Sequence, residues 1–453
     1  MNCENTVDVK FGNITKQYEV IKDPVPHILI DSKKELHGWY EGLQPYGHRE
    51  CTAERLLINP YNGCTHDCVY CYAHALWGYF ALYREKKVVT VFKDFDKHIA
   101  KQLDEISIAS CGYLSPVTDP FQPINKKYHL TEKIIDEFVK RNIPVEVITK
   151  NKISDEAIKL MKQQPHSFGQ VSIITLNDEL RRKLSPGGAS VKDLLNNLKM
   201  LSDNGIYAVC RIDPIIPYIT DNKTELKELV STVVEYGAKH LIVSCMDIPR
   251  VLKQNIEKIL SEDKPGMMDK INFRYVESMK NDLHAEEFYR RGLFDFMRTL
   301  AEEKKVTVSL CMEYELTGEK DKRVAYVKGM NRHFMTSKNC EGMDTPLYKR
   351  NGDKFYPIDC NGACLTCKDN ICGISDLSTA GKWKLNDYKR WSKKIYNLSS
   401  LPSMRLDSAK VQPQYESEII EEINSKCHIP QINETAINLK NKPKQTSFGE
   451  WSM

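Results

Sequence analysis

Short apolar runs alternate with helical patterns between residues 56 and 312 of the chain. The runs are rich in Val, Ile and Leu on both faces, which is typical of buried strands in a parallel sheet. Six runs have this character: Leu56–Asn59, Ile106–Leu114, Val145–Thr149, Val171–Leu176, Tyr207–Arg211 and His240–Cys245. A seventh run, Val306–Cys311, is a candidate extension of the same series.

The segments between these runs carry helix signals. Ser190 and Asp193 form an S-x-x-D start close to a capping box, and Gly205 follows at the expected end of that helix. The next helix is expected to begin near Thr224 and to end at Gly237. Strand and helix alternate six times, so the sequence predicts an α/β fold with a partial (β/α)6 TIM-like barrel.

The pattern divides the chain into four regions. Residues 1–55 form an N-terminal extension without clear periodicity, and residues 56–315 form the (β/α)6 core. Residues 316–378 are rich in Gly, Asn and Cys and have few apolar runs, which predicts a small Cys-rich Fe–S domain held together by metal. Residues 379–453 form a polar tail that mixes basic and aromatic residues. For residues 381–410 of this tail we favour a solvated amphipathic helix over a nucleic-acid surface.

Composition and charge narrow the class of protein. The chain has 453 residues, 41% hydrophobic and 28% charged, and its net charge of +4 is too small for an overall polyanion-binding protein. No apolar run approaches the roughly 18 residues that a membrane span needs. The N-terminus lacks the basic and then apolar layout of a secretory signal. We therefore expect a cytoplasmic protein without a membrane segment.

Fifteen cysteines need an explanation in a cytosolic chain, because a reducing compartment does not sustain structural disulfides. Three of them, Cys64, Cys68 and Cys71, lie in the loop directly after the first predicted strand. In a (β/α) barrel this loop lies at the carboxyl-terminal face, where active sites form. Three thiolates on one loop match three irons of a [4Fe–4S] cluster and leave the fourth iron open. A zinc site with His66 as the fourth ligand is the alternative, although the spacing differs from that of structural zinc sites.

Residues 59–73 read N-P-Y-N-G-C-T-H-D-C-V-Y-C-Y-A. This segment resembles the radical S-adenosylmethionine (SAM) superfamily, whose signature is C-x-x-x-C-x-aromatic-C, with Tyr70 as the aromatic residue. The resemblance covers residues 50–315. Together with V-T-D-P-F-Q-P-I at residues 117–124 and R-I-D-P-I-I-P at residues 211–217, it is similar to the subgroup that includes spore photoproduct lyase-like proteins, often called DNA repair photolyases.

The resemblance implies a mechanism and a set of cofactors. Cys64, Cys68 and Cys71 would ligate the [4Fe–4S] cluster, and S-adenosylmethionine would chelate the fourth iron. Reductive cleavage of SAM would then give a 5′-deoxyadenosyl radical that abstracts a hydrogen from a peptide, a nucleic acid or a metabolite. Flavodoxin or ferredoxin would donate the electron.

Two other functions stay open beside this one. A spore photoproduct lyase-like DNA repair lyase is the first, and the second cysteine cluster and the small net charge count against it. A non-catalytic, zinc-bound binding protein is the other.

Further residues are expected near SAM on the same face of the barrel. Arg211 could fork onto the SAM carboxylate, and Tyr70 and Tyr72 could pack near the adenine. The full set of candidate SAM contacts is Tyr70, Tyr72, Ser115, Thr118, Asp119, Thr149, Lys150, Ser172, Arg211 and Asp213. The chain departs from related proteins in one place: where they often have L-E-P, it reads Leu184-Ser185-Pro186, so a carboxylate contact expected there is absent or supplied from elsewhere.

The remaining cysteines fall into two kinds. Four of them have the spacing C-x3-C-x2-C-x4-C and can close a [4Fe–4S] or a zinc site. These four are Cys360, Cys364, Cys367 and Cys372. Because a radical SAM core precedes them, we favour a second, auxiliary [4Fe–4S] cluster, with Cys311 and Cys340 as alternative ligands. Cys111 and Cys245 lie within strand patterns and are interpreted as small core residues or, alternatively, as hydrogen donors to a product radical.

Overall fold

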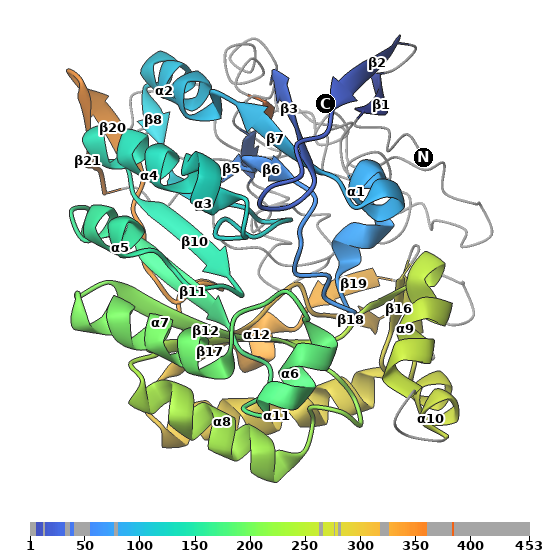
Figure 1. Cartoon of the computed structure of the whole chain (residues 1–453). Coiled ribbons are helices and arrows are strands. Elements are labelled where there is room, and N and C mark those ends of the chain that lie inside the picture. The colour runs from blue at the N-terminus through green and yellow to red at the C-terminus, as the bar shows by residue number, and fades with distance from the viewer. Residues whose placement is uncertain are drawn as a thin grey trace, which may run out of the picture.

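Seven parallel strands form the centre of the protein in the computed structural model (Figure 1). The structure describes residues 6–11, 14–31, 37–39, 55–76, 80–261, 266–275, 277–279, 282–317, 326–359 and 383–384. The parallel strands, in sheet order, are β5 (Arg55–Ile58), β9 (Cys111–Leu114), β10 (Val145–Thr149), β11 (Phe168–Ser172), β12 (Tyr207–Ile215), β13 (His240–Cys245) and β17 (Thr307–Leu310). Each pairs with the next in chain order, so the α/β fold and the strand series are confirmed, with the candidate seventh strand included.

One predicted strand, Ile106–Leu114, is in fact two. Its first part, β8 (Ile108–Ala109), pairs antiparallel with β20 (Tyr348–Asn351), and only β9 joins the parallel sheet. The prediction merged them because both parts are buried and apolar. The pairing partner of β8, β20, lies more than 200 residues later in the chain, so the local sequence pattern could not reveal it.

Another predicted strand was shifted. β11 begins at Phe168 and ends at Ser172, whereas the apolar run suggested residues 171–176. Its first half contains Gly169 and Gln170, which are not apolar, so the hydrophobic pattern did not extend to the true start of the strand. A Cβ at position 169 would lie 2.6 Å from Leu201 Cδ1, so only glycine lets the neighbouring helix pack there. Gln170 is fully buried because polar partners inside the sheet satisfy its amide.

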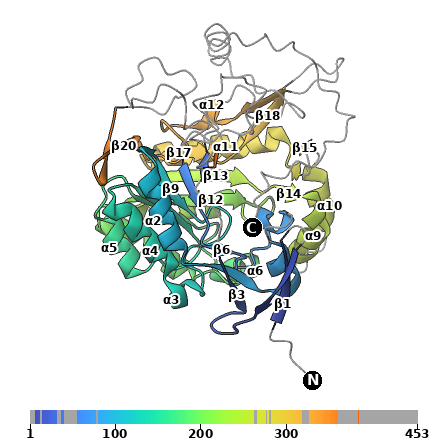
Figure 2. The same ribbon diagram turned by 90° about the horizontal axis from the view of Figure 1, so that it is seen from above.

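Helices lie along the outer face of the curved sheet, as Figures 1 and 2 show. They are α2 (Phe95–Glu105), α4 (Leu130–Lys140), α5 (Asp155–Met161), α7 (Val191–Asp203), α8 (Lys223–Glu235) and α11 (Glu287–Glu303). Their apolar sides and the outward-facing strand residues share one large hydrophobic core. The inner face of the sheet is not covered by these six helices.

The helix starts follow from side-chain caps. Ser190 accepts a hydrogen bond from the N–H three residues on, as the predicted cap of α7 requires. The side chain of Asn222 accepts two backbone N–H groups, so α8 begins at Lys223, one residue before the predicted Thr224. Gly237, with φ of +104°, follows the end of α8 in the left-handed conformation that glycine favours.

Shorter elements surround this core. Before and within its first half lie β1 (Thr6–Phe11), β2 (Ile14–Glu19), β3 (His27–Asp31), β4 (His37–Trp39), β6 (Tyr61–Asn62), α1 (Ala81–Lys86), β7 (Val89–Lys93), α3 (Asn125–Tyr128) and α6 (Asp178–Leu184). After β13 lie β14 (Ile248–Pro249), α9 (Lys253–Ser261), α10 (Met267–Arg274), β15 (Glu277–Met279), β16 (Asp282–His284), β18 (Tyr314–Thr317), β19 (Tyr326–Gly329), α12 (Asn331–Phe334), β21 (Lys354–Pro357) and β22 (Trp383–Lys384). The N-terminal extension thus contains strands that its lack of periodicity did not reveal. Of these, β3 supports β7, which in turn pairs with β6. Within the described residues, no helix has both the length and the apolar character to cross a bilayer.

The inner face of the sheet changes character along its strands. Near the amino-terminal ends a small apolar cluster fills the space, made of Cys111, Phe168, Val209 and Ile242. Further along the strands polar side chains take over, where Gln170 donates to Glu146 and Arg211 donates to Gln170. Hydrogen-bonding groups are therefore available inside the sheet towards its carboxyl-terminal end.

His240, the first residue of β13, is buried without charge. Its Nδ1 lies 2.8 Å from Thr307 Oγ1, and its Nε2 lies 3.1 Å from Ser309 Oγ and 3.2 Å from the Cys340 carbonyl oxygen. Gly342 packs so closely on the ring that a Cβ there would be 2.3 Å from His240 Cγ. Burial lowers the pKa of His240 to about 4.

We expect acid to destabilise the fold through His240. Between pH 6.5 and 4 the unfolded chain protonates this residue and the folded chain does not, so the free energy of unfolding falls by up to about 1.4 kcal/mol per pH unit. Above pH 6.5 the ring is neutral in both states and adds no slope. In the variant His240→Gln, the free energy of unfolding should fall by about 3 kcal/mol less between pH 6.5 and 4 than in the wild type. Urea unfolding at several pH values measures this difference. Equal slopes in the two proteins would contradict the lowered pKa.

Candidate functional site

The three cysteines of the first cluster share one loop at the carboxyl-terminal end of the parallel sheet. The loop follows β6, and Gly63, with φ of +92°, makes the turn into it. A Cβ at position 63 would lie 2.8 Å from Tyr83 Cβ, so this turn needs glycine. Cys68 is buried, whereas Cys64 and Cys71 are partly buried. Burial raises the pKa of all three thiols, that of Cys71 to about 12, so a metal that binds them as thiolates must displace their protons.

The contacts of His66 count against the single-zinc alternative. In the part of the chain that the structure describes, no three His, Cys, Asp or Glu side chains are placed to hold one metal ion. His66, the fourth ligand of the zinc alternative, turns elsewhere. Its Nδ1 lies 3.4 Å from Asp119 Oδ2, and its Nε2 lies 3.4 Å from Asn151 Nδ2. Three thiolates spread along one loop suit a [4Fe–4S] cluster, because each binds a different iron.

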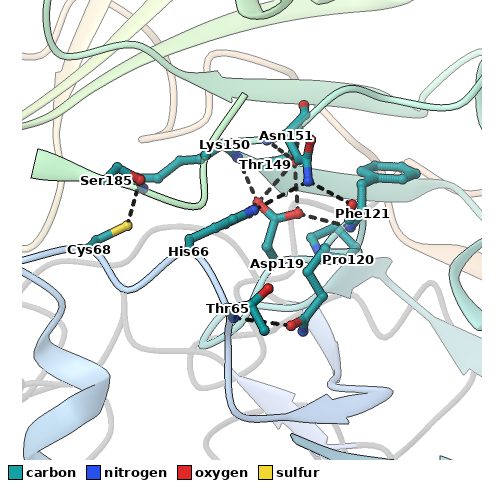
Figure 3. A network of polar contacts seen from close by, with 12 residues as sticks. Thr65, His66, Cys68, Asp119, Pro120, Phe121, Thr149, Lys150, Asn151 and Ser185 are labelled. Carbon is teal, nitrogen blue, oxygen red and sulfur yellow. Dashed lines mark hydrogen bonds and ion pairs between the residues drawn. The ribbon is translucent and has the colours of Figure 1, made fainter. Parts of the chain in front are cut away.

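The carboxylate of Asp119 joins this loop to two others (Figure 3). It accepts hydrogen bonds from the Phe121 N–H at 2.8 Å and the Thr149 hydroxyl at 2.9 Å. It also accepts the Lys150 N–H at 2.7 Å and faces the His66 ring. Asp119 is only 3% exposed, so these groups take the place of water around its carboxylate. Asp119 and Thr149, both predicted to contact SAM, point towards each other, and the geometry gives them the role of holding the cysteine loop in place.

Gln122 strengthens the same connection. Its Oε1 accepts the Thr65 N–H at 3.3 Å, and its Nε2 donates to the Gly63 carbonyl at 3.2 Å. Gln122 is fully buried, so both ends of its amide are used within the protein.

The other side of the cysteine loop is held by residues 184–188. The Val69 N–H donates to the Leu184 carbonyl at 2.9 Å, and the Gly187 N–H donates to the His66 carbonyl at 3.1 Å. A Cβ at Gly187 would lie 2.1 Å from the Thr65 carbonyl oxygen, so the two backbones touch with no room for a side chain. Sequence reasoning noticed this segment only because L-S-P replaces L-E-P there.

Several buried hydroxyls at the same end of the sheet lack hydrogen-bond partners. Ser115 Oγ and Thr118 Oγ1 follow β9, and Ser172 Oγ ends β11. Both amide atoms of Asn59, just before the cysteine loop, are likewise unpaired. Unpaired buried polar atoms are costly, so this set fits a site that a polar ligand completes. The three hydroxyls are among the residues predicted to contact SAM.

Arg211 and Asp213 face the interior from β12 and pair with each other, with Arg211 Nε 3.1 Å from Asp213 Oδ2. Arg211 also donates to Gln170 at 2.8 Å and to Cys311 Sγ at 2.9 Å, and Ser244 donates to Asp213. Burial alone would raise the pKa of Asp213, but Arg211 and Ser244 outweigh it and hold the pKa below its usual value. The Arg211 guanidinium is thus engaged within the protein, which argues against the predicted fork onto the SAM carboxylate.

Tyr70, Tyr72 and Lys150, three of the candidate SAM contacts, lie beside the cysteines. Tyr70 is buried, and Lys150 Nζ lies 5.8 Å from the centre of its ring. Tyr72 is half exposed, and its hydroxyl donates to the Pro116 carbonyl at 3.0 Å. Burial raises the pKa of Tyr70, so its hydroxyl stays protonated.

The two cysteines predicted as alternative hydrogen donors do not lie with the cysteine loop. Cys111 begins β9 at the opposite end of the strand, within the apolar cluster. Cys245 ends β13, but it is part of the core between sheet and helices, because its neighbour Ser244 is the residue that faces inward to Asp213. Both placements favour the core interpretation. Cys311 was predicted only as an alternative ligand of the auxiliary cluster. In the structure its sulfur accepts a hydrogen bond from Arg211 on the inner face of the sheet.

The four cysteines of the second cluster, Cys360, Cys364, Cys367 and Cys372, lie outside the described residues. The described chain before them ends in the hairpin of β20 and β21. Cys340, the other alternative ligand, is buried, and its carbonyl accepts the Ser309 hydroxyl at 2.6 Å.

Comparison with known proteins decides the family. Residues 58–232 match the model of the Radical SAM superfamily. The chain contains a radical SAM domain. It is 27% identical over 385 residues to the radical SAM Nalpha-GlyT isomerase of Pseudomonas phage M6, an alignment that covers 81% of this chain and 78% of the phage protein.

Two further likenesses are weaker. An uncharacterized protein of Methanocaldococcus jannaschii is 25% identical over 263 residues, which cover 55% of this chain and 94% of that protein. Spore photoproduct lyase with bound AdoMet and dinucleoside spore photoproduct aligns at 14% identity and a TM-score of 0.48, over 63% of this chain and 81% of that chain.

The protein is therefore a radical SAM enzyme. Enzymes of this superfamily use a [4Fe–4S] cluster and SAM and need a reductant, which agrees with the cofactors predicted from the sequence. The cysteine loop, the unpaired hydroxyls and the loops that clamp them are the parts of this chain that fit those two groups.

We expect Gly187→Ala to weaken iron binding. The new methyl group would overlap the Thr65 carbonyl, so the cysteine loop and residues 184–188 must separate at a cost of about 1–3 kcal/mol. Iron per chain after anaerobic reconstitution measures the effect. Gly292→Ala on α11 is the matched control, because nothing lies within 4 Å of its new Cβ, and it should keep the wild-type iron content. Unchanged iron binding in Gly187→Ala would show that this contact does not hold the loop.

Proposed function

We propose that this radical SAM enzyme is an isomerase: it takes a hydrogen from its substrate, lets the substrate rearrange, and returns a hydrogen. The observation that carries the proposal is the alignment with the phage isomerase. It spans 385 residues, whereas the superfamily match from residue 58 to residue 232 spans 175. The likeness therefore extends well beyond the part that all radical SAM enzymes share.

The proposed substrate is Nalpha-GlyT or a close analogue, after the name of the same relative. The inner face of the sheet supports a polar substrate. Arg211, Asp213 and Ser244 present charged and hydroxyl groups at the carboxyl-terminal end, beyond the apolar cluster that closes the other end. Arg211 and Asp213 already pair with each other, and a polar substrate can add hydrogen bonds to this lining, whereas an apolar substrate would only exclude water from it.

Each part of the site has a proposed role. Cys64, Cys68 and Cys71 bind three irons of the cluster, and Ser115, Thr118, Ser172, Lys150, Tyr70 and Tyr72 surround SAM at the fourth. When bound and reduced, this pair supplies the radical that starts the reaction. Asp119 and Thr149 keep the cysteine loop fixed, and the interior network orients the substrate so that only the chosen C–H bond is presented.

Three expectations from the sequence remain proposals alongside this one. Cys360, Cys364, Cys367 and Cys372 bind an auxiliary [4Fe–4S] cluster, flavodoxin or ferredoxin supplies the electron, and the protein works in the cytoplasm. Two such clusters would give about eight irons per chain, and one would give about four.

Replacement of Cys64, Cys68 and Cys71 by Ala should abolish SAM cleavage, because no open-iron cluster can then form. The measurement is 5′-deoxyadenosine formed anaerobically from SAM and dithionite, together with iron content. Cys210→Ala is the control, since that thiol is buried in the core between sheet and helices, and it should keep cleavage. Cleavage by the triple variant would refute the assignment of the cysteine loop.

Isomerisation predicts a product of unchanged mass. The reconstituted enzyme, given SAM, dithionite and Nalpha-GlyT, should convert this probe into a species with a new chromatographic retention time and the same mass. A product of different mass would contradict isomerisation. Cleavage of SAM with no conversion of the probe would contradict the proposed substrate.

A further inference from the structure

We propose that the Ser185 hydroxyl donates a hydrogen bond to the sulfur of Cys68 in the cluster-bound enzyme, and that this bond raises the reduction potential of the [4Fe–4S] cluster. The inference rests on the proposed role of Cys64, Cys68 and Cys71 as cluster ligands. It gives position 185 a function of its own, at the site where the chain has serine within L-S-P.

The direction of the bond follows from the chemistry of the two atoms. Ser185 Oγ lies 3.0 Å from Cys68 Sγ, a distance at which a free thiol or the hydroxyl could be the donor. A sulfur that ligates iron has lost its proton and can only accept. Once the cluster is bound, the hydroxyl must therefore be the donor.

The position of Ser185 does not depend on the cluster. Its N–H donates to the Arg181 carbonyl at 2.8 Å, and its own carbonyl accepts Arg181 Nη1 at 3.0 Å and the Gly188 N–H at 3.1 Å. Arg181 is fixed in turn, because its Nε lies 3.1 Å from Asp178 Oδ1. The hydroxyl is thus already aimed at Cys68 by contacts within the protein.

The buried surroundings of Ser185 and Cys68 strengthen the hydrogen bond between them. Ser185 is 4% exposed and Cys68 is 9% exposed, so water has little access to replace the hydroxyl. On either side of Ser185, the backbone contacts Val69–Leu184 and Gly187–His66 hold the two segments together. In such a place of low dielectric constant, a hydrogen bond to sulfur is stronger than in water.

The expected effect on the cluster follows from its charge. Reduction adds one electron, and much of the added charge falls on the sulfurs. A donated hydrogen bond stabilises this more negative state more than the oxidised one, so the potential rises. Removal of the hydroxyl should therefore shift the midpoint potential to more negative values and make the cluster harder to reduce.

The test compares two variants of the same shape. Threonine keeps the hydroxyl and valine replaces it with a methyl group, so Ser185→Thr and Ser185→Val differ in the hydrogen bond alone. Ser167→Ala is the control for loss of a buried hydroxyl, because Ser167 bonds to Val145 at the amino-terminal side of β11. Each full-length protein is reconstituted anaerobically and titrated with dithionite and mediators. Electron paramagnetic resonance then follows the cluster signal that changes when SAM is added.

We expect a more negative midpoint potential in Ser185→Val than in Ser185→Thr, and wild-type values in Ser185→Thr and Ser167→Ala. Equal potentials in the valine and threonine variants, each with a full complement of iron, would overturn the inference and leave the proposed function intact. A SAM-sensitive signal that survives in the Cys64, Cys68 and Cys71 triple variant would instead remove the ligand assignment on which the inference rests.

Discussion

The buried carboxylate of Asp119 is the contact on which the arrangement of the site depends. A carboxylate that is nearly inaccessible to water needs partners within the protein. Asp119 accepts hydrogen bonds from the loop after β10, and its Oδ2 lies 3.4 Å from Nδ1 of His66 on the cysteine loop. Because one carboxylate contacts its own loop and two others, displacement of any of these loops removes one of its partners. The rigidity of the site is thus electrostatic in origin.

The sheet divides its two faces and its two ends between different tasks. Outward-facing residues pack on the helices and supply stability, and the amino-terminal end of the inner face is closed by an apolar cluster. Towards the carboxyl-terminal end the inner face carries a buried ion pair between Arg211 and Asp213. Burial of such groups costs stability, so their presence in this region indicates a functional role.

The sequence predicted what depends on local pattern and left out what depends on distant partners. Strands such as Val145–Thr149 and the cap at Ser190 were found because their signals lie within a few residues. The start of β11 was missed because its residues depend on partners distant in the sequence. Gly169 is needed for close packing of Leu201, and buried Gln170 is stabilised by its hydrogen bond to Glu146. The cysteine loop was evident from its spacing. Its clamps were not, because His66 and Gly187 give no sign in the sequence that their backbones touch.

The contact between His66 and Gly187 also bears on how the protein is made. These residues are 121 positions apart (187 − 66), so the ribosome releases the cysteine loop long before the segment that holds it. A nascent chain that has reached only β10 carries the thiols but not their support. The cysteine loop therefore gains this support only after the ribosome has released the segment that follows α6.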